Sequence, residues 1–175
     1  MTNFVIDMSH STIGFSVRHM MVSHIHGTFE SYSAKLSVVN IENLLDANIS
    51  FNIDVASIST KNFDRDIHLV SHDFFDADKY PKISFVSTSI EKIEENIYAL
   101  NGNLTIRDIT KSVTFDTKYT GSGVNPWNQE VYGFQSKGKI DRRDFNLIYN
   151  TLLETGGVLI SDEIEITIDL EVNPA

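Results

Sequence analysis

The sequence predicts an all-β fold, an eight-stranded antiparallel barrel with one amphipathic helix between strands three and four. Three observations lead to this prediction. Apolar and polar residues alternate along most of the chain, turn-forming residues separate the alternating segments, and one segment alone follows the period of a helix.

Eight segments have the period-two alternation of strands with one buried and one solvent-facing side. The last segment is the clearest, and its apolar positions are Ile164, Ile166, Ile168, Leu170 and Val172. The other seven segments cover residues 12–18, 32–38, 47–55, 83–85, 98–106, 113–119 and 132–140.

The connections between these segments indicate how the strands pair. Turn formers occur at Glu95-Asn96, at Arg107-Asp108 and in the glycine- and proline-containing stretch 120–127. Long strands that follow one another directly favour an antiparallel meander, and eight strands are enough to close a sheet and remove its exposed edges. A two-sheet sandwich with the same number of strands is the competing architecture.

The stretch NFDRDIHLVSHDFFDADKYPKISF, residues 62–85, interrupts the alternation. Its apolar residues fall at i, i+4, i+7 and i+11, which makes one stripe on a helix: Phe63, Ile67, Val70 and Phe74. Thr60 or Asn62 can cap the start of the helix, and Pro81 marks the return to extended chain. We therefore expect an amphipathic helix laid over one end of the barrel.

Length and composition limit the class of protein. The 175 residues are expected to form a single domain, 1–175, and their 41% hydrophobic and 22% charged content is ordinary for a globular protein. Fourteen basic and 24 acidic residues give a formal charge of −10, which argues against a nucleic-acid partner. The absence of cysteine excludes disulfides, a thiol nucleophile and cysteine metal sites.

The beginning of the chain bears on its location. The first residues, MTNFVIDMSH, have neither the basic nor the apolar region of a secretory signal. No apolar run approaches the roughly 20 residues of a membrane span. We expect a cytoplasmic protein without a membrane span.

Five blocks of the sequence together resemble the YceI-like family. They are IDMSHSTIGFSVRHMMVSHIHGTF, the stretch 62–85 quoted above, GNLTIRDITKSVTF, RRDFNL and ETGGVLISDEIEITIDLE, and they occur in the family's order over nearly the whole chain. The resemblance implies a lipocalin-like barrel that binds, sequesters or transports a long apolar lipid in its interior. It implies an isoprenoid or isoprenoid quinone-like ligand and no known reaction, so we expect no enzyme and no cofactor besides the lipid.

The chain departs from the family at two turns, where Asp108 and Asn146 replace glycine. Asp and Asn are the non-glycine residues that best tolerate a left-handed backbone, so both turns are expected to survive.

The alternation and the resemblance together give a set of candidate ligand contacts. The predicted lipid-binding residues are Ile13, Phe15, Val17, His19, Met20, Phe51, Ile53, Phe75, Phe85, Tyr98, Leu100, Phe115, Tyr132 and Phe134. Arg18, Lys137 and Arg142 are predicted to lie at the rim beside the head group of the lipid. Because the protein is strongly acidic, we expect a preference for neutral head groups over pyrophosphate.

Two other functions remain open at this stage. His19, His24 and His26 could hold a metal ion in a metal-dependent enzyme, although no carboxylate stands at matching spacing. His68 and His72 are better explained as a solvated helix face paired with Asp64 and Asp73, so no metal site is assigned. A barrel filled by its own side chains would instead be a solid-core interaction module, and a homodimer is one expected assembly.

Overall fold

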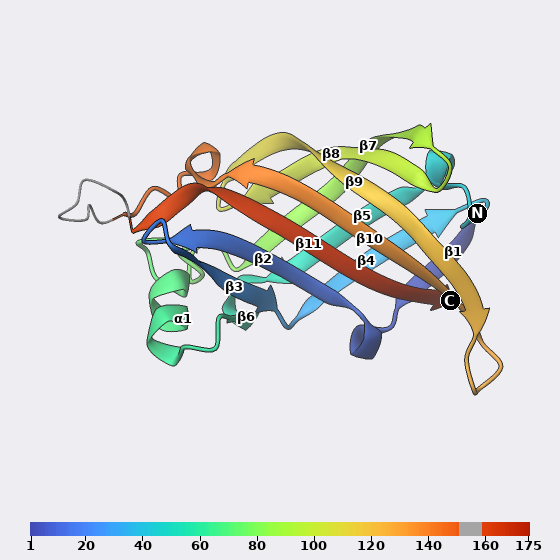
Figure 1. Cartoon of the computed structure of the whole chain (residues 1–175), viewed down its shortest axis with the longest axis horizontal. Helices are drawn as coiled ribbons and strands as arrows, with labels where there is room; N and C mark the ends of the chain where they lie inside the picture. The colour runs from blue at the N-terminus through green and yellow to red at the C-terminus, as the bar shows by residue number, and fades with distance from the viewer. Residues whose placement is uncertain (151–158) are drawn as a thin grey trace.

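The computed structural model describes residues 1–150 and 159–175 of the chain. Its strands form one antiparallel sheet closed into a barrel, and helix α1 (Phe63–Val70) lies at one end of it (Figure 1). The strands are β1 Thr2–Ile6, β2 Thr12–His19, β3 Ser23–Phe29, β4 Tyr32–Val38, β5 Asn48–Asp54, β6 Ile58–Ser59, β7 Lys82–Glu94, β8 Ile97–Ile106, β9 Ile109–Val124, β10 Glu130–Asp141 and β11 Ile160–Pro174. Short 3-10 helices lie between them at Met8–His10, Leu44–Asp46, Val55–Ser57 and Arg142–Phe145.

Eight strands close the barrel. The order around the ring is β1-β4-β5-β7-β8-β9-β10-β11, and β1 pairs in turn with β11. β2, β3 and β6 extend this ring along the barrel axis, because β2 pairs with β11, β3 with β2 and β6 with β3. Each of the first three barrel strands along the chain therefore consists of two segments: β1 and β2, β3 and β4, and β5 and β6. The predicted eight-stranded antiparallel barrel, with its helix between the third and fourth strands, is confirmed.

The sheet is interrupted at the end of the barrel where α1 lies. Within the described residues β6 pairs with β3 alone, and β7 pairs with β5 from Lys82 onward but not with β6. α1 connects β6 to β7 and lies at the same end as the β2–β3 turn, whereas both chain termini lie at the opposite end (Figure 1). The two ends of the barrel are therefore built differently.

Helix α1 is shorter than expected and packs through a different face. Asn62 is its cap, since the Asn62 side chain accepts a hydrogen bond from the backbone N–H of Arg65. Phe63 and Ile67 are 77% and 52% exposed, while Leu69 packs on the core. The predicted stripe is wrong at Phe63 and Ile67, whereas Val70 packs on the core and Phe74 is buried in the turn that follows the end of the helix at Val70. None of the helices in ranges 1–150 and 159–175 is long and apolar enough to cross a membrane.

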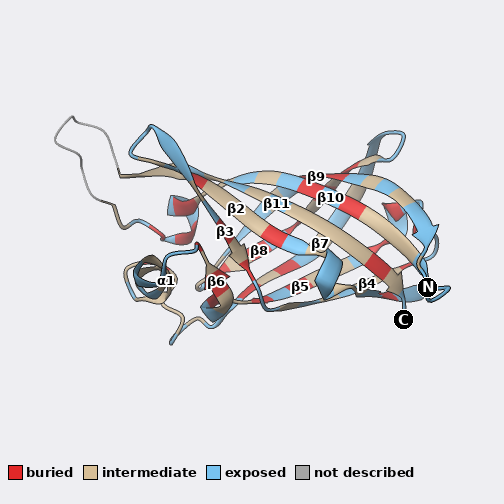
Figure 2. Cartoon of the chain, turned by 60° about the horizontal axis from the view of Figure 1, so that its bottom comes forward, coloured by how far each residue is buried: buried red, intermediate tan, exposed pale blue. Residues whose placement is uncertain are grey.

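The end of the barrel opposite α1 is filled by side chains. A second core cluster occupies it, formed by Phe4, Val38, Ile41, Leu44, Ala47, Tyr98, Phe134 and Val172. The hydroxyl of Tyr98 donates to the backbone oxygen of Glu42 at 3.3 Å, which fixes the loop before β5 across this end. Buried positions alternate with exposed ones along the strands around it (Figure 2). This cluster closes one end of the barrel.

The two turns that depart from the family pattern behave differently. Asn146 has a left-handed backbone with φ of 59°, as expected. At the β8–β9 turn it is Arg107, with φ of 57°, and not Asp108 that takes the left-handed conformation. The first part of the ETGGVLISDEIEITIDLE block, residues 154–158, lies outside the described residues.

Candidate functional site

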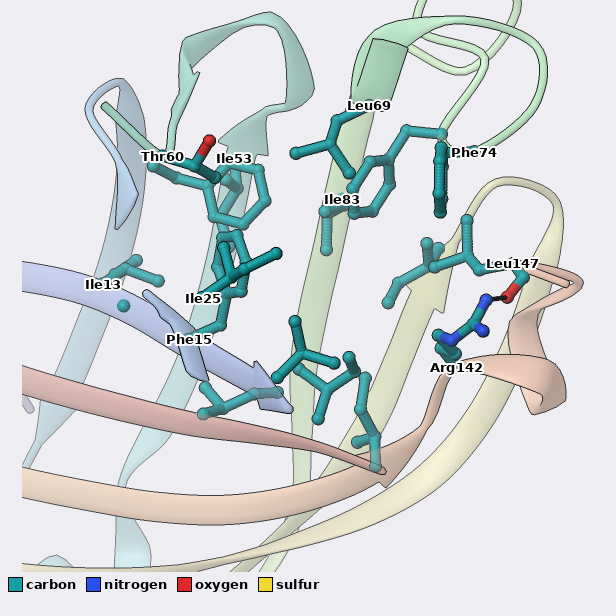
Figure 3. A pocket seen from close by; sticks show the side chains of 18 of the residues that line it. Ile13, Phe15, Ile25, Ile53, Thr60, Leu69, Phe74, Ile83, Arg142 and Leu147 are labelled. Carbon is teal, nitrogen blue, oxygen red and sulfur yellow. Dashed lines mark hydrogen bonds between the residues drawn. The ribbon is translucent and has the colours of Figure 1, made fainter. Parts of the chain in front are cut away.

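A cavity of about 620 Å³ lies inside the barrel on the α1 side. Apolar side chains of the strands form most of its wall, and Leu69 and Phe74 enter it from α1 and the turn that follows (Figure 3). Asn62 and Asp64 are exposed to solvent and also line the cavity, so the cavity reaches the surface near the start of α1. The barrel is therefore hollow in one half and filled in the other.

Three aromatic rings lie against the wall and leave the centre of the barrel open. Each ring covers a glycine on the neighbouring strand: Phe15 covers Gly27, Phe85 covers Gly102 and Phe115 covers Gly138. A Cβ added to any of these glycines would lie 2.3 to 2.6 Å from the nearest ring carbon. Because glycine has no side chain, the rings have room to lie over these positions. The cavity depends on this arrangement, since the same rings turned inward would fill it.

The floor of the cavity meets the second core cluster. Thr117 and Ser136 lie side by side on β9 and β10, line the cavity and are both buried. Thr117 is also the cross-strand partner of Tyr98, a member of that cluster. Their two hydroxyl oxygens are 2.8 Å apart. The floor of an otherwise apolar cavity therefore carries a pair of hydroxyl groups.

Polar side chains line the α1 end of the cavity. The backbone N–H and the hydroxyl of buried Thr60 donate to Asp66 Oδ1 at 2.9 and 2.6 Å. The guanidinium of Arg65 donates to Thr60 Oγ1 at 2.7 Å and to the Thr60 backbone oxygen at 2.6 Å. His68 Nε2 lies 2.8 Å from Asp73 Oδ2, which confirms the predicted pairing of these two residues. These bonds hold α1 beside the opening.

Arg142 has a structural role at this end. It is 3% exposed, and its guanidinium donates to two backbone oxygens that precede β11 and to two at the start of β11. The acceptors are the carbonyls of Leu147, Tyr149, Ile160 and Ser161, at 2.6 to 3.3 Å. Its bond to Leu147 is visible in Figure 3. Asp162 is a further partner at 3.7 Å. The guanidinium is therefore engaged by the protein itself.

Most of the predicted lipid-binding residues line the cavity. Ten of them do so: Ile13, Phe15, Val17, His19, Phe51, Ile53, Phe75, Phe85, Leu100 and Phe115. Tyr98 and Phe134 lie instead in the second core cluster, and Tyr132 packs against that cluster. Met20 lies in the β2–β3 turn and is 45% exposed. The alternation identified inward-facing positions correctly but could not show at which depth the barrel is filled. That the ten residues bind a lipid stays a prediction.

Of the three predicted rim cations, Arg142 alone borders the cavity. Arg18 is exposed and donates to the backbone oxygen of Met21 at 2.8 Å. Lys137 is exposed on β10 between the inward-facing Ser136 and Gly138, so its side chain points away from the interior. Period-two alternation places both of these residues on the outer face of the barrel.

Several lining residues were absent from the predicted set. They include Ile25, Phe29, Leu69, Ile83, Leu104, Ile106, Thr117, Ser136, Ile140, Ile164, Ile166 and Ile168. Many of them stood in the alternating runs, so the signal was present. Ile25 was left out because its neighbours His24 and His26 were considered as metal ligands. Leu69 was left out because the predicted apolar stripe lay on a different face of the helix.

The proposed histidine metal cluster is wrong. His19 faces the cavity, whereas His24 and His26 are exposed on the outer face of β3, with ring centroids 6.2 Å apart. Among the described residues, Asp7, His10 and Glu171 are the one group of three side chains close enough together that they could hold a metal ion. Asp7 and His10 pair with each other at 2.9 Å. Hydrogen bonds from Ser9 and His10 lower the pKa of Asp7 to about 2, and Asp7 raises the pKa of His10.

Comparison with known proteins identifies the family. The model of the YceI-like domain matches residues 4–172. The chain belongs to the YceI-like family. The match begins within β1 and ends within β11, so it includes all the strands between them.

Three similar proteins illustrate how far this YceI-like barrel is shared. A UPF0312 protein of Staphylococcus epidermidis is 39% identical over 166 residues, which cover 94% of each chain. The YCEI protein of Campylobacter jejuni is 32% identical, with a TM-score of 0.77 over 97% of this chain and 96% of that one. A polyisoprenoid binding domain from Saccharophagus degradans is 13% identical, with a TM-score of 0.72 and full coverage of both chains. This last likeness is one of fold.

Proposed function

We propose that this YceI-like protein binds one long, neutral, apolar lipid of the isoprenoid or isoprenoid quinone type inside the barrel. The observation that carries the proposal is the apolar cavity of about 620 Å³, closed at one end by the second core cluster and reaching the surface beside α1. The shared fold of the polyisoprenoid binding domain of Saccharophagus degradans supports the choice of ligand class. Apolar burial is the binding mechanism, and it requires no bond to be made or broken.

The volume of the cavity sets the size of the ligand. At about 30 Å³ for each water-sized group, the cavity holds about 20 non-hydrogen atoms, or about four isoprene units. Each buried methylene contributes about 0.8 kcal/mol, so such a chain gains roughly 16 kcal/mol before the costs of association. With an association cost of about 8 kcal/mol, within the range of about 4–15 kcal/mol, that gain corresponds to a dissociation constant of about 1 µM. Chain length and cavity shape can therefore provide selectivity without a strong polar contact.

The charged and polar groups that a ligand passes at the opening disfavour the entry of a pyrophosphate head group. The guanidinium of Arg142 donates to four backbone carbonyls, and that of Arg65 is bound to Thr60. Asp64 adds a carboxylate to the lining, and the chain as a whole carries a formal charge of −10. A pyrophosphate would have to displace existing bonds in a negative field.

The other functions considered from the sequence have less support. A metal-dependent enzyme built on His19, His24 and His26 would need side chains that lie on opposite faces of the sheet. A solid-core interaction module does not account for the cavity. The absence of catalysis, a transport role, a cytoplasmic location and a homodimer stay predictions.

Competition binding tests the proposal. Lipid-stripped protein would be titrated with a neutral 20-carbon isoprenoid alcohol, about the size the cavity holds, and with its pyrophosphate. We expect saturable binding of one molecule per chain and weaker binding of the pyrophosphate. No uptake of either lipid would contradict the proposal, and tighter binding of the pyrophosphate would contradict its head-group preference.

A further inference from the structure

Among the described residues that line the cavity, Thr117 and Ser136 are the polar side chains that lie away from the α1 end. Thr117 and Ser136 are 4% and 8% exposed, and both line the cavity. Their oxygens are 2.8 Å apart, so one hydroxyl donates to the other. Within the described residues neither oxygen has a hydrogen bond to any other group.

One of the two hydroxyl hydrogens of this pair has no acceptor among the described residues. Each hydroxyl group can donate one hydrogen bond and accept two. The bond between Thr117 and Ser136 uses one of the two hydrogens, and the second has no acceptor among the residues that the structure describes. Buried donors without an acceptor are unfavourable and uncommon in folded proteins. The pair is therefore set to donate a hydrogen bond into the cavity.

The position of the pair is deep. The β8–β9 turn lies at the α1 end, because Arg107 in that turn donates to the backbone oxygens of Phe74 and Asn146. Thr117 stands eight residues beyond Ile109, the first residue of β9. At about 3.4 Å per residue and a tilt of about 40°, this places the hydroxyl pair roughly 20 Å along the barrel axis from that turn.

We propose that this pair binds a carbonyl or ether oxygen of the ligand, so that the oxygen-bearing end of the lipid enters the barrel first. Such an oxygen has lone pairs to satisfy and no hydrogen of its own, which matches the single donor on offer. The hydrocarbon end then lies among Leu69, Phe74 and Phe75 near the opening. This inference rests on the proposed function and states which end of the bound lipid lies deeper in the barrel.

The test uses two probes that differ in one oxygen: a straight-chain methyl ketone with a ¹³C carbonyl, and the alkane of the same length. For the wild-type protein we expect the ketone to bind about fivefold more tightly than the alkane, the value of one hydrogen bond. The infrared band of the bound carbonyl should lie at the lower frequency of a hydrogen-bonded ketone. Equal affinities together with a free-carbonyl band would overturn the proposal and leave the pair as a hydration site.

The double variant Thr117→Val/Ser136→Ala removes the hydroxyl pair and keeps its approximate volume. It should bind the alkane at least as well as the wild type and lose the preference for the ketone, together with the band shift. A preference that persists in this variant would place the oxygen elsewhere and refute the proposal. The single variant Ser136→Ala provides the same comparison with a smaller perturbation if the double variant is unstable.

Thr105 and Thr110 offer a matched control. Their hydroxyls are also paired across neighbouring strands, at 2.7 Å, but they are solvent-exposed and outside the cavity lining. Thr105→Val/Thr110→Val should keep both the fivefold preference and the band shift. Failure of every protein, including the wild type, to bind either probe would contradict the proposed function itself, which separates that failure from a failure of this inference.

Discussion

Gly27→Ala is predicted to shrink the cavity while leaving the barrel folded. The added Cβ would lie 2.3 Å from Cζ, 2.7 Å from Cε1 and 3.0 Å from Cε2 of the Phe15 ring. Ordinary contact between carbon atoms requires about 3.5 Å, so the ring must move by about 1 Å. The three atoms nearest to the new methyl group all belong to this ring, and the free space lies on the cavity side. The ring should therefore move into the cavity.

The magnitude follows from the space that the ring takes. Overpacking a filled core costs about 1–3 kcal/mol of stability, but here the neighbouring space is empty, so we expect a loss below about 1 kcal/mol. A displaced ring removes room for one or two methylene groups of the ligand, each worth about 0.8 kcal/mol. The dissociation constant of a chain that fills the cavity should therefore rise about 4- to 15-fold.

The assay is a pair of measurements on each variant: denaturant unfolding for stability and a fluorescence titration for lipid affinity. Phe15→Leu in the Gly27→Ala background should restore affinity, because the ring that was displaced is gone. Gly123→Ala is the matched control, since its nearest neighbour would be Val131 Cγ2 at 4.0 Å. A Gly27→Ala protein that loses stability but keeps full affinity would refute the reasoning.

Three more predictions follow from other residues. Phe51→Glu places a charge in the cavity wall and should abolish lipid uptake with an unchanged circular dichroism spectrum, and retained uptake would mean that the lipid binds elsewhere. Arg142→Ala should cost roughly 2–4 kcal/mol in denaturant unfolding, because it leaves buried backbone carbonyls without donors, and a loss below about 1 kcal/mol would contradict that role. NMR titration should find the pKa of His10 above 6.5 and that of Asp7 near 2, and Asp7→Asn should return His10 towards its ordinary value. The raised pKa of His10 contributes stability to the folded protein below pH 6.5, and this stability is lost as the pH rises through the folded-state pKa. The lowered pKa of Asp7 contributes stability above pH 3.8, and this stability is lost as the pH falls towards 2.

Sequence alternation predicted the barrel because a strand with one buried face leaves a period of two in the sequence. The run from Ile164 to Val172 became β11, which pairs with β10, β2 and β1 and so lies where the barrel closes. The same period does not show how deep a residue lies along the axis. Phe115 and Phe134 read alike in the sequence, yet Phe115 lines the cavity and Phe134 belongs to the core cluster that fills the other end.

The length of the helix and the face through which it packs could not be predicted for a related reason. The stripe from Phe63 to Phe74 assumes that the helix continues for three turns, but the chain turns after Val70, where the N–H groups of Phe75 and Ala77 bond back to Leu69 and Val70. A residue distant in sequence also holds this turn, because Arg107 donates to the backbone oxygen of Phe74. The sequence likewise does not show that the rings of Phe15, Phe85 and Phe115 lie over glycines, because those glycines stand on neighbouring strands.

Native mass spectrometry of the protein, purified without lipid removal, tests the central claim most directly. The account predicts one non-covalent ligand per chain, whose extracted mass corresponds to a neutral, largely hydrocarbon molecule of about 20 non-hydrogen atoms within the cavity. Loss of that ligand from Phe51→Glu but not from Val86→Glu, a change on the exposed side of β7, would place it in the barrel. Protein that carries no lipid and takes none up after lipid stripping would contradict the account.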